Sequence, residues 1–272
     1  MTSTLKTFIA GCACAVALTS ALPAQASVVI AGTRVIYQAT DAEVTVKLSN
    51  EGQAPALTQS WIDSGDLRAA PSAIDVPFTL TPPVARIDPG KAQTLRIVYT
   101  GEPLPQDHES VFWLNVLEVP PRPAAEDSDS NKLQLAFRSR IKLFFRPSGL
   151  KDSAAEAPAA VSWRVTRAGA HAALEAHNPT AYHVSFSGVE LLGGGKRVRS
   201  SEGGMVAPGQ TAVFPLAGDA VPGADSKVRY RAISDFGGEL IGEAAVGGSA
   251  PAAPPPPTAA TSATSGQDTR QP

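Results

Sequence analysis

The sequence predicts an all-β protein built from two immunoglobulin-like β-sandwich domains. Short runs of alternating apolar and polar residues recur along the chain, separated by turns to which 23 glycines and 24 prolines contribute. No long segment repeats apolar residues with the period of a helix. The length of 272 residues is sufficient for two domains that each bury a core.

The first 26 residues have the features of a secretory signal peptide. Lys6 supplies the positive start, a stretch of apolar and small residues runs from Phe8 to Leu22, and Ala24–Ala26 has the small-x-small form of a cleavage site. We predict cleavage after Ala26 and export from the cytoplasm. Both cysteines precede this site, so the mature protein would lack disulfides and rely on its cores. No later apolar run reaches the roughly 20 residues that a membrane-spanning helix needs.

Residues 27–147 form the first predicted domain. It contains seven strand-like segments, which is the number in a simple immunoglobulin-like sandwich. Trp61 is expected to anchor its core. The predicted strands are Val28–Tyr37, Glu43–Leu48, Leu57–Ile62, Phe78–Leu80, Thr94–Tyr99, Val111–Val119 and Asn131–Pro147.

The last of these segments, Asn131–Pro147, is about three times as long as an ordinary strand. Leu133, Leu135 and Phe137 recur at every second residue and therefore share one face. A long apolar strand whose edge is open can pair with another chain. Either the rest of the domain covers this edge, or the protein uses it to capture a partner.

Residues 151–247 form the second predicted domain, which is again rich in strand-like segments. Residues 248–272 contain mainly alanine, proline, serine and threonine, so we expect a disordered tail. The predicted strands of the second domain are Val161–Thr166, Ala172–Ala176, Tyr182–Leu192, Thr211–Leu216 and Lys227–Ser234.

Three stretches of the first domain, Gly32–Tyr37, Leu104–Val116 and Ile141–Pro147, form a specific combination. Together they resemble the periplasmic pilus-assembly chaperones of Gram-negative bacteria, and Leu104–Val116 looks like the signature of that family. His108 departs from the signature, where a longer basic or amide side chain is usual. In the second domain the resemblance is thinner and depends mainly on His177–Thr180 and Asp235–Gly238.

The resemblance implies two immunoglobulin-like domains in an L-shaped arrangement, and a chaperone that works in the periplasm. Its clients would be pilus subunits that lack one strand. The chaperone would lend them its long strand, with Leu133, Leu135 and Phe137 filling the client's groove (donor-strand complementation). It would then deliver them to an outer-membrane usher. The open edge would also allow free copies to self-associate.

Arg34 and Lys142 match the basic pair of the family, which implies that they hold the C-terminal carboxylate of the client. Lys142 has an even number and Phe137 an odd one, so strict alternation places them on opposite faces. We expect either a bulge or twist near Arg138–Arg140, or the use of both faces by different parts of the client.

Glu109, Arg146 and Asp235 match the interdomain ionic network of the family. The alternative is that they are solvated surface charges.

The loop Pro120–Ser130 is of moderate length, and the cysteine pair of long-loop members is missing. The chain therefore resembles the short-loop members, which typically assemble rod-like pili, and a thin or atypical surface fibre is the alternative.

Other functions have less support in the sequence. His171, His177 and His183 recur every six residues and could bind a metal on a periplasmic β-sandwich protein, but no carboxylate or cysteine cluster completes the set. No nucleophile elbow, HExxH or phosphate loop is present, so neither an enzyme nor a cofactor is expected; Asp63 and Asp66 read as turn residues. The net charge of −2 gives no reason to expect nucleic-acid binding. Two full sandwiches without a mature cysteine argue against a pilin.

Overall fold

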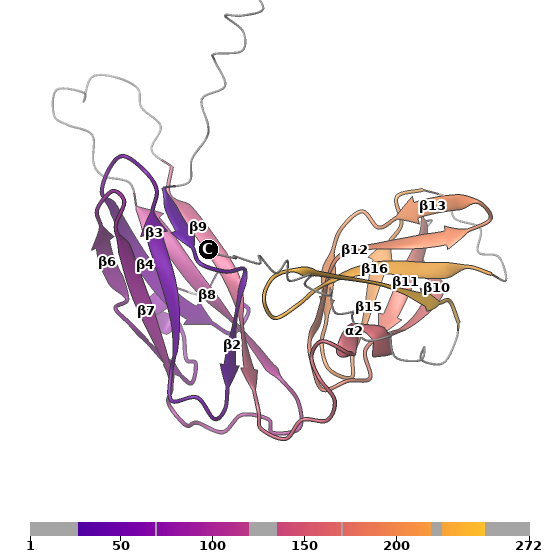
Figure 1. Cartoon of the computed structure of the whole chain (residues 1–272), viewed down its shortest axis with the longest axis horizontal. Helices are drawn as coiled ribbons and strands as arrows, with labels where there is room; N and C mark the ends of the chain where they lie inside the picture. Colours follow the sequence, from indigo (N-terminus) through magenta and orange to yellow (C-terminus); the bar gives the residue numbers. More distant parts are fainter. Residues whose placement is uncertain (1–26, 69, 120–134, 170, 219–224, 248–272) are drawn as a thin grey trace, which may run out of the picture. The chain divides into compact units, whose positions relative to one another are not determined.

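The computed structural model describes residues 27–68, 70–119, 135–169, 171–218 and 225–247. The chain divides into two compact units between Gly149 and Leu150. Each unit is built from packed β-sheets (Figure 1), so the predicted all-β class is confirmed. The predicted signal peptide, the loop 120–130 and the tail 248–272 lie outside the described residues. None of the helices in the described ranges has the length and hydrophobicity of a transmembrane helix.

The first unit is a sandwich of a four-stranded and a five-stranded sheet. Every strand pair in it is antiparallel except the parallel pair β2–β9. A 3-10 turn, Pro71–Ala73, follows β4. The four-stranded sheet has the order β1 (Val28–Ile30), β3 (Val44–Asn50), β7 (Ala92–Tyr99), β5 (Phe78–Thr81). The five-stranded sheet has the order β2 (Arg34–Gln38), β9 (Phe137–Arg146), β8 (Ser110–Val119), β4 (Ala56–Asp63), β6 (Val84–Ile87).

The core of the first unit lies between these two sheets and contains alternate residues of each strand. In β9 the odd positions point inward: Leu143 and Phe145 are buried, and Ile141 packs against the same cluster. The ring of Phe145 lies 4.6 Å from that of Tyr99 and 6.0 Å from that of Tyr37 (centroid to centroid). Burial of these side chains holds the C-terminal half of β9 firmly in the sandwich.

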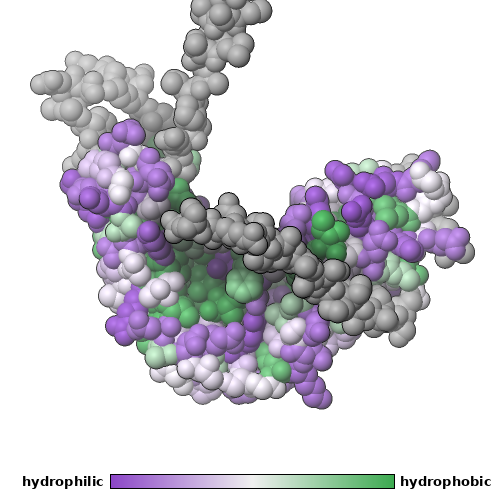
Figure 2. Space-filling model, viewed as in Figure 1, coloured by the Kyte–Doolittle hydropathy of each residue, from purple (hydrophilic) through white to green (hydrophobic). Residues whose placement is uncertain are grey.

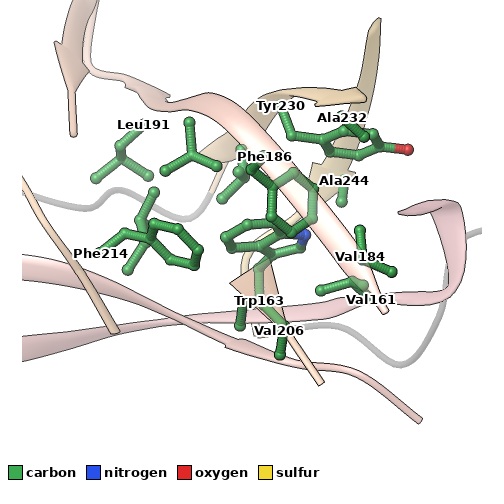
Figure 3. Packing of buried hydrophobic residues seen from close by; sticks show 14 of the residues in the cluster. Val161, Trp163, Val184, Phe186, Leu191, Val206, Phe214, Tyr230, Ala232 and Ala244 are labelled. Atoms are coloured by element: carbon green, nitrogen blue, oxygen red, sulfur yellow. The ribbon is translucent and has the colours of Figure 1, made fainter. Parts of the chain in front are cut away.

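The second unit is also made of β-sheets. Figure 3 shows its core, where Trp163 meets Phe186 edge-on and stacks with Tyr230, at centroid distances of 5.2 and 6.4 Å. A short helix, α2 (Ala157–Ala160), precedes its first strand. One sheet has the order β10 (Ser162–Ala168), β11 (His171–His177), β15 (Thr211–Pro215). The other has the order β13 (Lys196–Arg199), β12 (Val184–Gly193), β16 (Lys227–Ile233), β17 (Glu239–Ala245), with β14 (Gly204–Val206) also paired to β12.

The predicted strand Val28–Tyr37 is wrong, because it forms two strands in different sheets. Gly32 lies between them with φ 107°, a conformation that glycine adopts without steric cost. The chain therefore leaves the four-stranded sheet after β1 and joins the five-stranded sheet as β2. This crossing places Arg34 beside the last strand of the unit.

Further differences concern strand length and the placement of one tryptophan. The predicted strand Asn131–Pro147 begins only at Phe137 within the described residues. Trp61 is half-buried on the outer face of the five-stranded sheet, because the alternate residues Ser60 and Ile62 are the buried ones. Sequence patterns missed β6, β13, β14 and β17, which are short or rich in charged residues and glycine and pair with stronger strands.

Candidate functional site: the open half of strand β9

Strand β9 has two halves with different neighbours. Residues Lys142–Phe145 lie between β2 and β8, whereas Phe137–Ile141 pair with β8 alone. No strand in the described part of the chain pairs with the other edge of Phe137–Ile141. This segment, which we call the open half of β9, therefore has backbone N–H and C=O groups available to an added strand.

Apolar side chains accompany this open edge. Phe137 lies on the same strand face as the core residue Leu143, because the pairing of β9 with β8 runs without a shift from Phe137 to Phe145. Unlike Leu143, Phe137 is 57% exposed, and Leu135, just before the strand, is 55% exposed. Figure 2 shows apolar side chains gathered on one visible face of the first unit, with hydrophilic ones around them. Leu133, the third predicted groove-filling residue, lies outside the described residues.

The unbroken register also answers the question of parity. A bulge or twist near Arg138–Arg140 was one expectation, and the bulge is wrong because every residue from Phe137 to Lys142 has its partner on β8. Phe137 faces the side of the sandwich core, and Lys142 faces the outer side of the sheet. The strand thus presents Phe137 and Lys142 on opposite faces, and the use of both faces by different parts of a client stays a prediction.

The predicted anchor residues, Arg34 and Lys142, lie directly beside each other. They are register partners on the parallel strands β2 and β9, so their side chains leave the sheet on the same face. The Nζ atom of Lys142 lies 5.6 Å from the centroid of the Trp113 ring, and the guanidinium of Arg34 lies 5.7 Å from that of Phe144. Both aromatic contacts favour the cationic forms.

The electrostatics of this pair favour an anion. Burial, followed by the nearby charge of Arg34, lowers the pKa of Lys142 to about 8. Two cations held close together repel each other, and a carboxylate placed between them would relieve that repulsion through charge-assisted hydrogen bonds. The site can therefore bind a terminal carboxylate next to the open half of β9.

A buried carboxylate on β4, Asp63, holds the cations of the open half. Its side chain is 1% exposed and receives hydrogen bonds from Arg140 Nη2 at 2.5 Å and from Asn115 Nδ2 at 2.7 Å. Arg138 lies 3.6 Å from Asp63 and donates two hydrogen bonds to Asn115 Oδ1, at 2.7 and 2.9 Å. Arg138 also donates to the backbone carbonyl of Leu67. These contacts tie β9 to β8 and β4 in the stretch that β2 does not reach.

Two tryptophans complete this outer face. The guanidinium of Arg138 lies 4.9 Å from the centroid of the Trp61 ring, and that of Arg140 lies 4.1 Å from the centroid of the Trp113 ring. The pairing places Trp61 opposite Asn115 and Asp63 opposite Trp113. Cation–π contacts of this kind add to the ion pairs with Asp63.

Sequence reasoning missed the role of Asp63, which it assigned to a turn. The turn is real, since Asp63 Oδ1 accepts a hydrogen bond from the backbone N–H of Gly65. Burial alone would raise the pKa of Asp63, but hydrogen bonds from Arg140 and Asn115 outweigh it and hold the pKa below its usual value. The available signal was that Trp61 and Asp63 share one face of their strand. The pairing of β4 with β8, and of β8 with β9, is what brings this face next to the arginines.

The residues predicted to form an ionic network are found in both units. Arg146 Nε donates to Glu109 Oε1 at 2.7 Å, and their side chains are 12% and 2% exposed. Asp235 lies in the second unit, at the turn between β16 and β17. The ion pair fixes the end of β9 to the start of β8, and the part assigned to Asp235 stays a prediction.

The histidine spacing does not produce a metal site. His171 and His177 stand at opposite ends of β11, which places their Cα atoms about 20 Å apart at the usual rise of a strand. His177 contacts Thr211 Oγ1 at 3.3 Å. Among the described residues, no group of three potential metal-binding side chains is found. The metal-binding alternative thus has no support.

An open strand edge beside two neighbouring cations is an arrangement suited to pairing with another chain. Comparison with known proteins gives the family. Residues 27–151 match the N-terminal domain of the PapD pili and flagellar-assembly chaperones, and residues 156–244 match the C-terminal domain of the PapD pili-assembly chaperones. The chain therefore belongs to the PapD family of pili-assembly chaperones.

Three relatives illustrate the extent of the similarity. The probable fimbrial chaperone YadV of Escherichia coli K12 is 49% identical over 80% of this chain and 89% of its own, and its crystal structure aligns with a TM-score of 0.69. The chaperone FimB/FhaD of Bordetella pertussis is 50% identical over 82% of this chain and 89% of its own. The structure of the Salmonella enterica SafA pilin in complex with the SafB chaperone matches with 28% identity and a TM-score of 0.66, covering 83% of this chain and 99% of the other.

Proposed function

We propose that this protein is a periplasmic chaperone that binds pilus subunits by adding its open half of β9 to their incomplete sheets. The observation that carries the proposal is the combination of an unpaired strand edge with exposed apolar residues and a neighbouring cationic pair. The similar SafB chaperone is known in complex with a pilin. Backbone pairing is independent of the client's side chains, so one chaperone can serve several subunits.

Each face of β9 has a separate task in this mechanism. Phe137 and Leu135, with Leu133 as the next expected position, fill a groove in the client, and each buried side chain contributes roughly 1.5–3 kcal/mol. Arg34 and Lys142 bind the client's C-terminal carboxylate and so fix the register of the added strand. Register is important because a slip of one residue exchanges the two faces of a strand.

The Asp63 network prepares β9 for this pairing. By holding Arg138 and Arg140 against β4 and β8, it keeps the open half extended before a client arrives. A strand that is already ordered loses less conformational entropy on binding. Asp63 is therefore a positioning residue for client capture, although it faces away from the groove-filling side chains.

We propose the remaining steps from the sequence and from the resemblance to the family. The signal peptide is cleaved after Ala26, and the mature chain works in the periplasm. The loaded chaperone delivers its client to an outer-membrane usher. Asp235 joins Glu109 and Arg146 in an interdomain network, and free copies can self-associate through the open edge.

Recovery of a client from periplasm tests the proposal. The chaperone is co-expressed with a pilus subunit from the same organism, and the complex is purified through a tag on the chaperone. We expect Arg34→Ala and Lys142→Ala to abolish recovery of the subunit while the circular dichroism of the free chaperone stays unchanged. Arg96→Ala is the matched control, because Arg96 is an exposed arginine on the other sheet of the same unit. Recovery at the control level from both Arg34→Ala and Lys142→Ala would refute the proposal.

A further inference from the structure

The outer face of the β13-β12-β16-β17 sheet carries four arginines. Val228, Tyr230 and Ala232 of β16 are buried in the core of the second unit, so the alternate residues Arg229 and Arg231 point outward. The neighbouring strands bring further cations to the same face, Arg197 and Arg199 on β13.

These arginines line a hollow of about 230 Å³ in the sheet surface, which we call the arginine hollow. Gly188 lies on its lining, where the strand pairing of β12 with β16 shifts by one residue. A side chain at this position would meet the guanidinium of Arg231, since an added Cβ would lie 2.7 Å from Arg231 Nη2. Glycine thus leaves room for the arginine and for the hollow beside it.

The carboxylates of the hollow do not neutralise it. Glu190, 8% exposed, pairs with Arg199 at 2.8 Å and Arg197 at 3.4 Å. Glu239 accepts a hydrogen bond from Ser187 Oγ at 2.7 Å. Among the described residues, neither Arg229 nor Arg231 has a carboxylate within ion-pair distance, although both are half-buried. The lining therefore keeps an excess of positive charge on two guanidinium groups.

We propose that the arginine hollow binds an acidic segment of a partner protein, with a carboxylate side chain held by Arg229 and Arg231. Guanidinium groups bind carboxylates through paired hydrogen bonds. Arg229 and Arg231 are alternate residues of one strand, so their spacing matches that of alternate residues in an extended peptide. The hollow is smaller than the pockets that enclose a whole small molecule, so it fits a single side-chain group. Ile241 on β17 is 60% exposed and is the register partner of Arg231 on β16, so it supplies an apolar contact beside the charges.

This surface is independent of the strand-addition proposal, because it lies in the second unit and requires no pilus subunit. The test uses the full chain and a fluorescein-labelled peptide of six glutamates, with a peptide of six glutamines as the neutral control. Binding is measured by fluorescence anisotropy and by chemical-shift changes of the arginine Nε–H groups. We expect binding to the acidic peptide alone, and weaker binding as salt is added.

Three variants determine whether the hollow is the binding site. Arg229→Gln/Arg231→Gln should lower the affinity for the acidic peptide at least tenfold. Arg164→Gln/Arg167→Gln removes the same charge from strand β10 of the other sheet and should change the affinity less than twofold. Glu239→Gln adds net positive charge at the hollow and should raise the affinity, which gives a readout even if the first double variant does not fold.

Each contrary result overturns the proposal. Equal losses in the two double variants would mean that only the overall charge attracts the peptide. Unchanged affinity in Glu239→Gln, or no binding to the acidic peptide, would place any partner elsewhere. Binding to phosphatidylglycerol vesicles without binding to the peptide would assign the hollow to a lipid surface instead.

Discussion

Replacement of Asp63 by asparagine removes the carboxylate that Arg138 and Arg140 share, while it keeps the size of the side chain. Removing one partner of a buried ion pair costs about 3–5 kcal/mol. The side chains of Arg138 and Arg140 are 30% and 15% exposed, so water compensates part of this loss. We therefore expect the first unit to lose about 2–3 kcal/mol of unfolding free energy.

Urea unfolding followed by tryptophan fluorescence measures this change. Trp61 and Trp113 pack against Arg138 and Arg140, so their emission reports directly on this part of the first unit. Glu43→Gln is the matched control, because it breaks the pair Glu43–Arg96, whose side chains are 37% and 61% exposed. An exposed pair contributes roughly 0–1 kcal/mol. Equal effects of Asp63→Asn and Glu43→Gln would refute the reasoning.

The dependence on pH gives a second check. The pKa of Asp63 is lowered in the folded state, so the unfolded chain binds the proton more tightly. The stabilisation by Asp63 is then fully present above its ordinary pKa of 3.8 and is lost as the pH falls through the lower folded value. The wild type and Asp63→Asn should converge in stability at acid pH.

Amide hydrogen exchange of Phe137–Ile141 should also be faster in Asp63→Asn than in the wild type, since the Asp63 network holds this segment.

Two further predictions concern the client site. Because the pKa of Lys142 is about 8, client affinity measured by titration should fall as the pH rises through this value, while Lys142→Arg keeps its charge and should show no such fall. A pH-independent client affinity of the wild type would contradict the anchor role. The free protein should instead gain stability as the pH rises from about 8 to 10.5, since Lys142 binds its proton more tightly in the unfolded chain. Leu135→Glu should lower client affinity at least tenfold without changing the thermal unfolding of the free protein, because Leu135 is 55% exposed. Unchanged affinity in a pull-down series would show that Leu135 does not enter the client.

The strand pattern was largely predictable because alternation along a β-strand is a local property. The segments around Leu48, Leu95 and Leu143 gave clear alternation, and each of these residues is buried in the first core. Strands without a strong apolar side, such as β13 with Lys196–Arg199, gave no signal of their own. They form because a neighbouring strand offers hydrogen-bond partners, which a single segment does not reveal.

The all-β class and the pilus-chaperone resemblance could be predicted from the sequence. It also pointed to the strand that carries Phe137 and Lys142, because these depend on local periodicity and short motifs. The arrangement of the strands was needed to show that β2 stops beside Lys142 and leaves Phe137–Ile141 with one open edge. The same holds for the contact between Asp63 and Arg140. Such contacts depend on the pairing and register of strands that are far apart in the chain, and no local pattern specifies them.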